Sequence, residues 1–174
     1  MFGRCRRARD ANAIVGLQCI LGLVSAASPP SQSSPPSAPA AADLRLFRTF
    51  VTDDKNRPKI GNQDLMLGAR VGIDIKPDRD GMVGPGKGGM SVTPNDPAGL
   101  PPHLRPTSLT GGQSTLPVFS IAASKLGESL RFQAAKRHPE RHGFVEPSMA
   151  MKLEAYQDAL GATALDWAPW EAAA

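Results

Sequence analysis

Hydrophobic and polar residues alternate in several short stretches of the chain, which is the pattern of half-buried β-strands. In residues 44–51, LRLFRTFV, one face of the predicted strand carries Leu44, Leu46, Arg48 and Phe50. We expect further strands at residues 70–76, 89–93, 116–123, 129–133 and 142–146, and a short helix near residues 64–69. The pattern predicts a sheet of short strands joined by turns.

The pattern changes to the period of an α-helix after residue 148. Six residues recur at intervals of three or four, which places them on one helical face: Met149, Leu153, Tyr156, Leu160, Thr163 and Trp167. We therefore expect an α+β fold, a small strand-rich domain with one amphipathic C-terminal helix packed against it.

Composition divides the chain into segments. Residues 1–28 have a basic start, an apolar run and then small residues, which is the order of a secretory signal peptide. The alternative explanation, which we favour slightly less, is an upstream start codon that adds non-native sequence. Residues 29–42 are almost all Pro, Ser and Ala, as in a disordered linker. We expect a single domain at residues 43–168 and a flexible tail at residues 169–174.

Charge and cysteine content disfavour several classes of function. The formal net charge is +4, but four arginines and one aspartate among residues 1–10 supply +3 of it. The remaining +1 forms no basic stripe, so we expect no nucleic-acid-binding patch. Both cysteines, Cys5 and Cys19, precede the domain, which leaves it without a disulfide, a thiolate zinc site or a cysteine nucleophile. The apolar run at residues 13–24 is too short for a stable membrane span.

Two polar residues on predicted strands are candidates for ligand binding. Arg48 stands on an apolar face, where an arginine extends to water, pairs with an acid or binds an anion such as phosphate. The sequence around Ser91 lacks the second glycine and the following helix of a hydrolase nucleophile elbow, so Ser91 is a weak candidate for a nucleophile. It either donates a hydrogen bond to a ligand or is an ordinary turn serine.

His142 and Glu146 share a face if residues 142–146 form a strand. Such a pair performs acid–base chemistry, orients a ligand or simply faces water. On a helix, His138, His142 and Glu146 would suggest a metal site with two histidines and one carboxylate. The prolines and the glycine among them disfavour a helix, so our predicted site holds no metal. A metal-dependent enzyme that uses these three residues stays as a third, less favoured hypothesis of function.

The order and spacing of several short motifs resemble one known family. The motifs are Leu46-Phe47-Arg48, Asp80-Gly81, Gly88-Gly89-Met90-Ser91-Val92, Leu100-Pro101-Pro102 before Leu104, and residues 142–147 with Met149 and Met151 behind them. Together they span roughly residues 44–165 and are similar to the small type VI secretion effector toxins that look like NAD-dependent ADP-ribosyltransferases. The resemblance implies an ADP-ribosyltransferase-like fold and NAD as a substrate.

The resemblance also implies roles for individual residues. Arg48 contacts the pyrophosphate or ribose of NAD, Ser91 and Gly89 belong to the cofactor-binding set, and His142 lies beside the nicotinamide ribose. Our predicted catalytic set is His142, Glu146 and Ser91. Glu146 is included because the reaction needs a group that stabilises positive charge at C1′ in the transition state; the resemblance itself does not supply a catalytic glutamate at this position. Met90 stands where the family tends to have the first of two hydroxyl residues. The hypothesis therefore includes a degenerate relative, which would have the fold of the family without its activity.

As partners, the resemblance implies a cognate immunity protein or a macromolecular acceptor. The protein would be secreted or delivered as an effector, or cytoplasmic if the N-terminal extension is not native. The alternative function is a non-catalytic exported domain that binds a partner.

Overall fold

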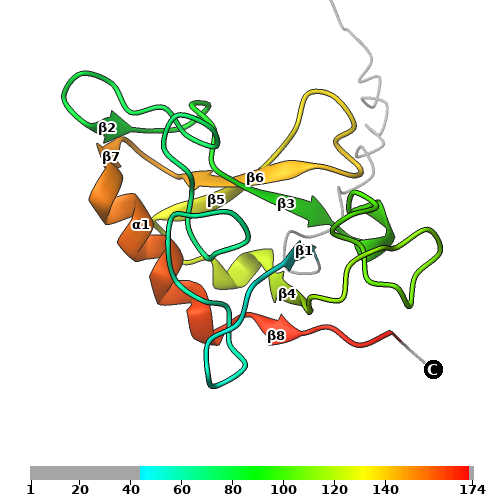
Figure 1. Ribbon diagram of the computed structural model, residues 1–174. Helices are drawn as coiled ribbons and strands as arrows, with labels where there is room; N and C mark the ends of the chain where they lie inside the picture. Colours follow the sequence, from blue (N-terminus) through cyan, green and yellow to red (C-terminus); the bar gives the residue numbers. More distant parts are fainter. Residues whose placement is uncertain (1–43, 173–174) are drawn as a thin grey trace, which may run out of the picture. The chain divides into compact units, whose positions relative to one another are not determined.

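The computed structural model describes residues 44–172; our expectations for the signal-like segment and the linker, residues 1–42, lie outside them. The described residues form a six-stranded antiparallel sheet in the order β5–β6–β3–β1–β4–β8 and a two-stranded sheet of β2 and β7 (Figure 1). The strands are β1 (Arg45–Thr49), β2 (Met82–Val83), β3 (Met90–Pro94), β4 (Val118–Ala122), β5 (Leu130–Ala134), β6 (Gly143–Pro147), β7 (Met151–Lys152) and β8 (Ala168–Pro169). The helices are α1 (Leu153–Ala162) and the short 3-10 helices η2 (Pro97–Gly99), η3 (Ala123–Lys125) and η4 (Thr163–Leu165).

The described part of the chain is thus a small strand-rich domain with one α-helix, which is compatible with the α+β class. Five predicted strands are confirmed as β1, β3, β4, β5 and β6, and the predicted C-terminal helix is confirmed as α1. No helix within residues 44–172 has both the length and the apolar character needed to cross a membrane.

The main core lies between the large sheet and α1. Leu46 and Phe50 from the β1 segment are fully buried there, together with Tyr156 and Leu160 from α1. Trp167 packs edge-on against Phe50, with 5.0 Å between the ring centroids. Met149 was predicted on the same helical face, but it precedes α1 and is 59% exposed.

The hydroxyl of Tyr156 fastens α1 to the sheet. It accepts a hydrogen bond from Met90 N at 3.0 Å and donates one to Val145 O at 2.6 Å. Met90 and Val145 are direct partners across β3 and β6. The helix is therefore tied to the two strands that carry Ser91 and follow His142.

Two local predictions were wrong because turns satisfy their backbones. Residues 70–76 form no strand; Asp74 instead accepts hydrogen bonds from the backbone and side chain of Arg70, which closes a turn. Residues 64–69 form no helix, and Leu65 has a φ of 57°, outside the helical region.

The C-terminal segment also differs from our expectation of a flexible tail. Residues 168–169 form β8, which pairs with β4 through Phe119–Pro169 and Ser120–Ala168. Trp170 donates its backbone N–H to Val118 O and packs against a second, smaller core cluster of Phe47, Leu100 and Val118. The domain therefore extends at least to Trp170.

Candidate functional site

A cleft of about 290 Å³ lies where β1 and β3 separate. These two strands pair only through Leu46–Pro94 and Phe47–Thr93. Beyond that point β1 stays paired with β4, while β3 stays paired with β6. The large sheet therefore opens into two parts, and side chains from both line the gap.

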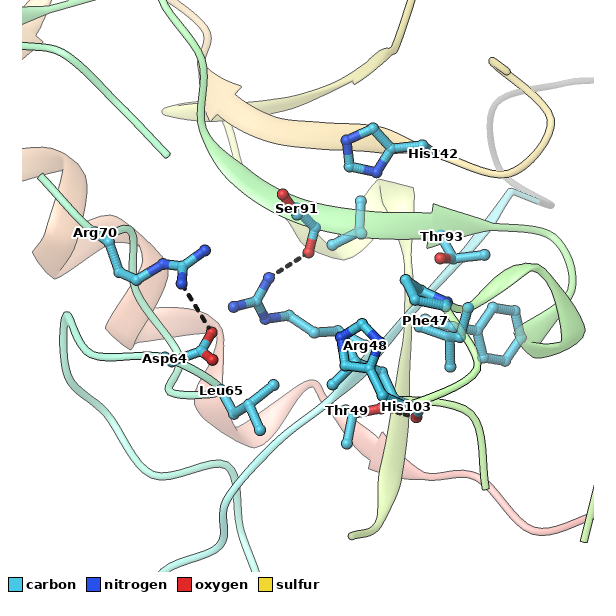
Figure 2. Close-up of a pocket in the computed structure, with 14 residues that line it drawn as sticks. Phe47, Arg48, Thr49, Asp64, Leu65, Arg70, Ser91, Thr93, His103 and His142 are labelled. Carbon is cyan, nitrogen blue, oxygen red and sulfur yellow. Dashed lines mark hydrogen bonds and ion pairs between the residues drawn. The ribbon is translucent and has the colours of Figure 1, made fainter. Parts of the chain in front are cut away.

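Five segments supply the walls of the cleft: β1, β3, the loops at residues 64–70 and 100–104, and His142 just before β6. The lining residues are Phe47, Arg48, Thr49, Asp64, Leu65, Arg70, Ser91, Val92, Thr93, Leu100, Pro101, His103, Leu104 and His142 (Figure 2). Thr49 fixes the second loop to β1, since its hydroxyl donates a hydrogen bond to Leu104 O at 2.6 Å.

Arg48 is the central polar residue of the cleft. The residue is only 8% exposed, and its Nη1 donates a hydrogen bond to the backbone O of Ser91 at 2.5 Å. Its guanidinium lies 5.5 Å from the centroid of the Phe50 ring. Among the described residues, Arg48 Nε is the one buried side-chain nitrogen or oxygen atom that lacks a hydrogen-bond partner.

The charge of Arg48 is incompletely compensated. Burial lowers the pKa of Arg48, and the carboxylates of Asp74 and Asp64 oppose that shift. A guanidinium remains protonated under all ordinary conditions. Within residues 44–172 no carboxylate lies within ion-pair distance of Arg48. A buried cation with a free donor is unfavourable unless something binds it, so the arrangement suits an anionic ligand.

Ser91 and His142 line the part of the cleft that is formed by β3 and the start of β6. Ser91 is in the middle of the β3–β6 pairing, opposite Phe144. The His142 ring packs edge-on against Phe144, with 4.8 Å between centroids. Burial lowers the pKa of His142, which favours the neutral imidazole at neutral pH. A neutral imidazole offers one donor and one acceptor, so it can hydrogen-bond a sugar hydroxyl or accept a proton.

The other two predicted site residues lie outside the cleft. Glu146 is 1% exposed; its Oε1 accepts hydrogen bonds from Arg131 Nε at 2.9 Å and Nη2 at 2.7 Å, and its Oε2 accepts one from Gly86 N at 2.8 Å. Gly89 packs against β6, where an added Cβ would lie 2.3 Å from Val145 O. The structure therefore brings Arg48, Ser91 and His142 together, and places Glu146 in an ion pair with Arg131 and Gly89 in close packing against β6.

The sequence did not identify the loop residues Asp64, Arg70 and His103 as cleft residues. A signal for Arg70 existed, because Arg70 and Asp74 are opposite charges four residues apart. That spacing can close a turn as well as support a helix.

The three residues of the metal hypothesis do not meet. His138 is exposed and lies 3.6 Å from Glu140, whereas Glu146 is buried against Arg131. Residues 44–172 contain no group of three His, Cys, Asp or Glu side chains arranged to hold a metal ion.

A scan against protein-family models, a search of curated proteins and a search of solved structures each found no match. The function is therefore inferred from the chemistry of the cleft and from the motif resemblance.

Proposed function

We propose that the cleft binds NAD and that the domain is an ADP-ribosyltransferase-like toxin domain or a degenerate relative. One observation carries this proposal. Three of the four residues that we assigned to NAD binding, Arg48, Ser91 and His142, line one cleft although they come from distant parts of the sequence. If these three residues had only unrelated surface roles, we would expect them to lie apart from one another.

The polar groups of the cleft suit the phosphate and ribose of a nucleotide. Arg48 has an unpaired Nε–H in a buried setting, where a charge-assisted hydrogen bond to phosphate is stronger than in water. His142 and Ser91 add groups that can bond sugar hydroxyls. The volume of about 290 Å³ is at the small end for ligand pockets. We expect it to enclose the nicotinamide-ribose end of NAD with its phosphate, and to leave the adenosine end outside.

The proposed reaction is a substitution at C1′ of the nicotinamide ribose. A bond forms between C1′ and the acceptor nucleophile, and the C1′–N bond breaks. Nicotinamide leaves as a neutral molecule with the bonding electron pair. The proton of the acceptor passes to neutral His142 or to water. Holding the dinucleotide in a fixed position supplies much of the rate enhancement in such a reaction.

The location of Glu146 favours a second candidate, in which the cleft binds NAD without catalysing transfer. Glu146 was the expected group for stabilising positive charge at C1′, but its carboxylate is held by Arg131 and Gly86 N. Met90, at the position of the family's first hydroxyl, is fully buried in the core. Both observations agree with a degenerate relative that binds a ligand or partner.

Calorimetric titration of the full chain with NAD tests the proposal. Arg48→Met removes the charge at similar volume, and Arg57→Met is the matched control, because Arg57 pairs with Asp53 outside the cleft. We expect saturable binding by the wild type and the control, and affinity at least about tenfold lower for the folded Arg48 variant.

Two further results separate the candidates. Release of free nicotinamide in the presence of acceptor proteins would identify the transferase, whereas binding without release would identify the degenerate relative. A folded wild-type chain that binds no NAD would refute both.

A further inference from the structure

Arg70 is a second cation of the cleft, and its two carboxylate partners hold it very differently. The two carboxylate oxygens of Asp74 accept hydrogen bonds from Arg70 Nε and Nη2, each at 2.9 Å, and Asp74 Oδ2 also accepts one from Arg70 N. The Asp74 side chain is 6% exposed. Asp64 contacts only Nη1, at 3.1 Å, and its side chain is 68% exposed.

This difference makes the ion pair with Asp74 stable and the contact with Asp64 replaceable. A bidentate pair with a buried carboxylate is costly to break, because Asp74 alone would remain as an unpaired buried charge, although the Arg70 side chain itself is 32% exposed. An exposed single contact contributes little, since water and ions compete for both groups. Arg70 is therefore fixed in place by Asp74, and its Nη1 edge can exchange Asp64 for another anion.

The exchangeable edge faces the same cleft as Arg48. Both arginines and Asp64 line it, and the guanidinium of Arg48 points toward the Arg70–Asp64 pair (Figure 2). Asp64 is close enough to oppose the effect of burial on the pKa of Arg48. One carboxylate thus lies beside two guanidinium groups.

We propose that Asp64 is an internal counterion that a diphosphate displaces. One phosphate takes the place of Asp64 on Arg70 Nη1, and the neighbouring phosphate bonds Arg48, which has the free Nε donor. The inference rests on the proposed binding of a dinucleotide in this cleft. It adds Arg70 as a second anion-binding residue and Asp64 as a group that lowers affinity for every anionic ligand.

The test measures the binding of inorganic pyrophosphate to the full chain by calorimetric titration. Asp64→Asn removes the competing charge on an exposed turn, and Asp158→Asn removes a charge from an exposed position of α1 outside the cleft. We expect the Asp64 variant to bind pyrophosphate about three- to tenfold more tightly than the wild type, and the Asp158 variant to match the wild type. Equal affinities for the two variants would overturn the inference.

A double variant tests whether the gain passes through Arg70. Arg70→Lys keeps the positive charge but removes the planar fork that can hold Asp74 and a phosphate together. Added to Asp64→Asn, it should abolish the gain in pyrophosphate affinity. A gain that persists in the double variant would reveal a general charge effect and overturn the inference.

The outcomes also separate this inference from the proposed function. Arg48-dependent NAD binding with no effect of Asp64→Asn on pyrophosphate would overturn only the counterion role. Failure of both the wild type and the Asp64 variant to bind pyrophosphate or NAD would overturn both proposals.

Discussion

Replacing Glu146 by glutamine tests whether this residue stabilises the fold or serves the cleft. Glutamine has nearly the same shape as glutamate, so the change creates no cavity. It removes the negative charge that accepts two hydrogen bonds from Arg131 and one from Gly86 N. We expect the Glu146→Gln protein to be clearly less stable and to bind NAD as the wild type does.

The magnitude follows from the hydrogen bonds that glutamine can still make. Its amide has one oxygen and one NH2 group, so either Arg131 or Gly86 N must face a donor. A buried donor left without an acceptor costs about 1–3 kcal/mol, and the remaining bonds lose their charge assistance. Arg131 is 46% exposed and can turn to water, which offsets part of the loss. We expect the free energy of unfolding to fall by about 2–4 kcal/mol.

Urea denaturation of both proteins measures this loss, with NAD titration below the transition as the second readout. Glu128→Gln is the control, since Glu128 is exposed in the turn before β5, and its loss should stay within about 0.5 kcal/mol. The reasoning would be refuted if Glu146→Gln were as stable as this control. It would also be refuted if the variant stayed folded but lost NAD binding.

Three further perturbations test the framework around the cleft. Tyr156→Phe removes the hydroxyl that joins α1 to β3 and β6, so urea denaturation should show a loss of about 1–3 kcal/mol; no loss would contradict the tie. Burial raises the pKa of Asp74, but the hydrogen bonds from Arg70 outweigh it and hold the pKa below its ordinary value. The stability that Asp74 contributes is therefore fully present above about pH 4 and is lost as pH falls through the lower pKa of the folded state. The melting temperature of Asp74→Asn should thus fall less steeply below about pH 4 than that of the wild type. Parallel curves of melting temperature against pH for the two proteins would contradict this. Gly86 and Gly88 both have positive φ, but only at Gly88 would a Cβ meet the Asp74 carbonyl oxygen, at 2.2 Å. Thermal unfolding should show about 1 kcal/mol lost for Gly86→Ala and more than about 3 kcal/mol for Gly88→Ala, and equal losses would count against the packing described.

The strands that could be predicted are those whose alternation matches a buried face. The β1 segment is the clearest case, because Leu46 and Phe50 enter the main core while Phe47 enters the smaller cluster. The strands β2, β7 and β8 have two residues each, which is too short for any period to appear. Residues 70–76 alternate as a strand would, but the Arg70–Asp74 turn satisfies their backbone locally.

Arg48 could be singled out because it departs from its local pattern, whereas the spacing of short motifs was needed to group Ser91 and His142 with it. Arg48 interrupts an apolar face, and that departure marks the centre of the cleft. Glu146 was grouped with His142 because alternate residues share a face. Four residues along a strand nevertheless span about 13 Å, so a shared face did not imply a shared site. Asp64 and His103 reach the cleft on loops, whose course depends on packing that no local pattern records.

The central position of β1 shapes the order in which the domain can fold. Phe47 pairs with Thr93 on one side and Ser120 on the other, so the first strand of the described residues finds its neighbours only much later in the sequence. Phe50 also waits for Trp167 to cover it. A topology dominated by such distant contacts folds slowly, because long loops must close before any contact is gained. During synthesis, we therefore expect the apolar β1 strand to stay unpaired until Thr93 and Ser120 have been made, and Phe50 to stay uncovered until Trp167 has followed.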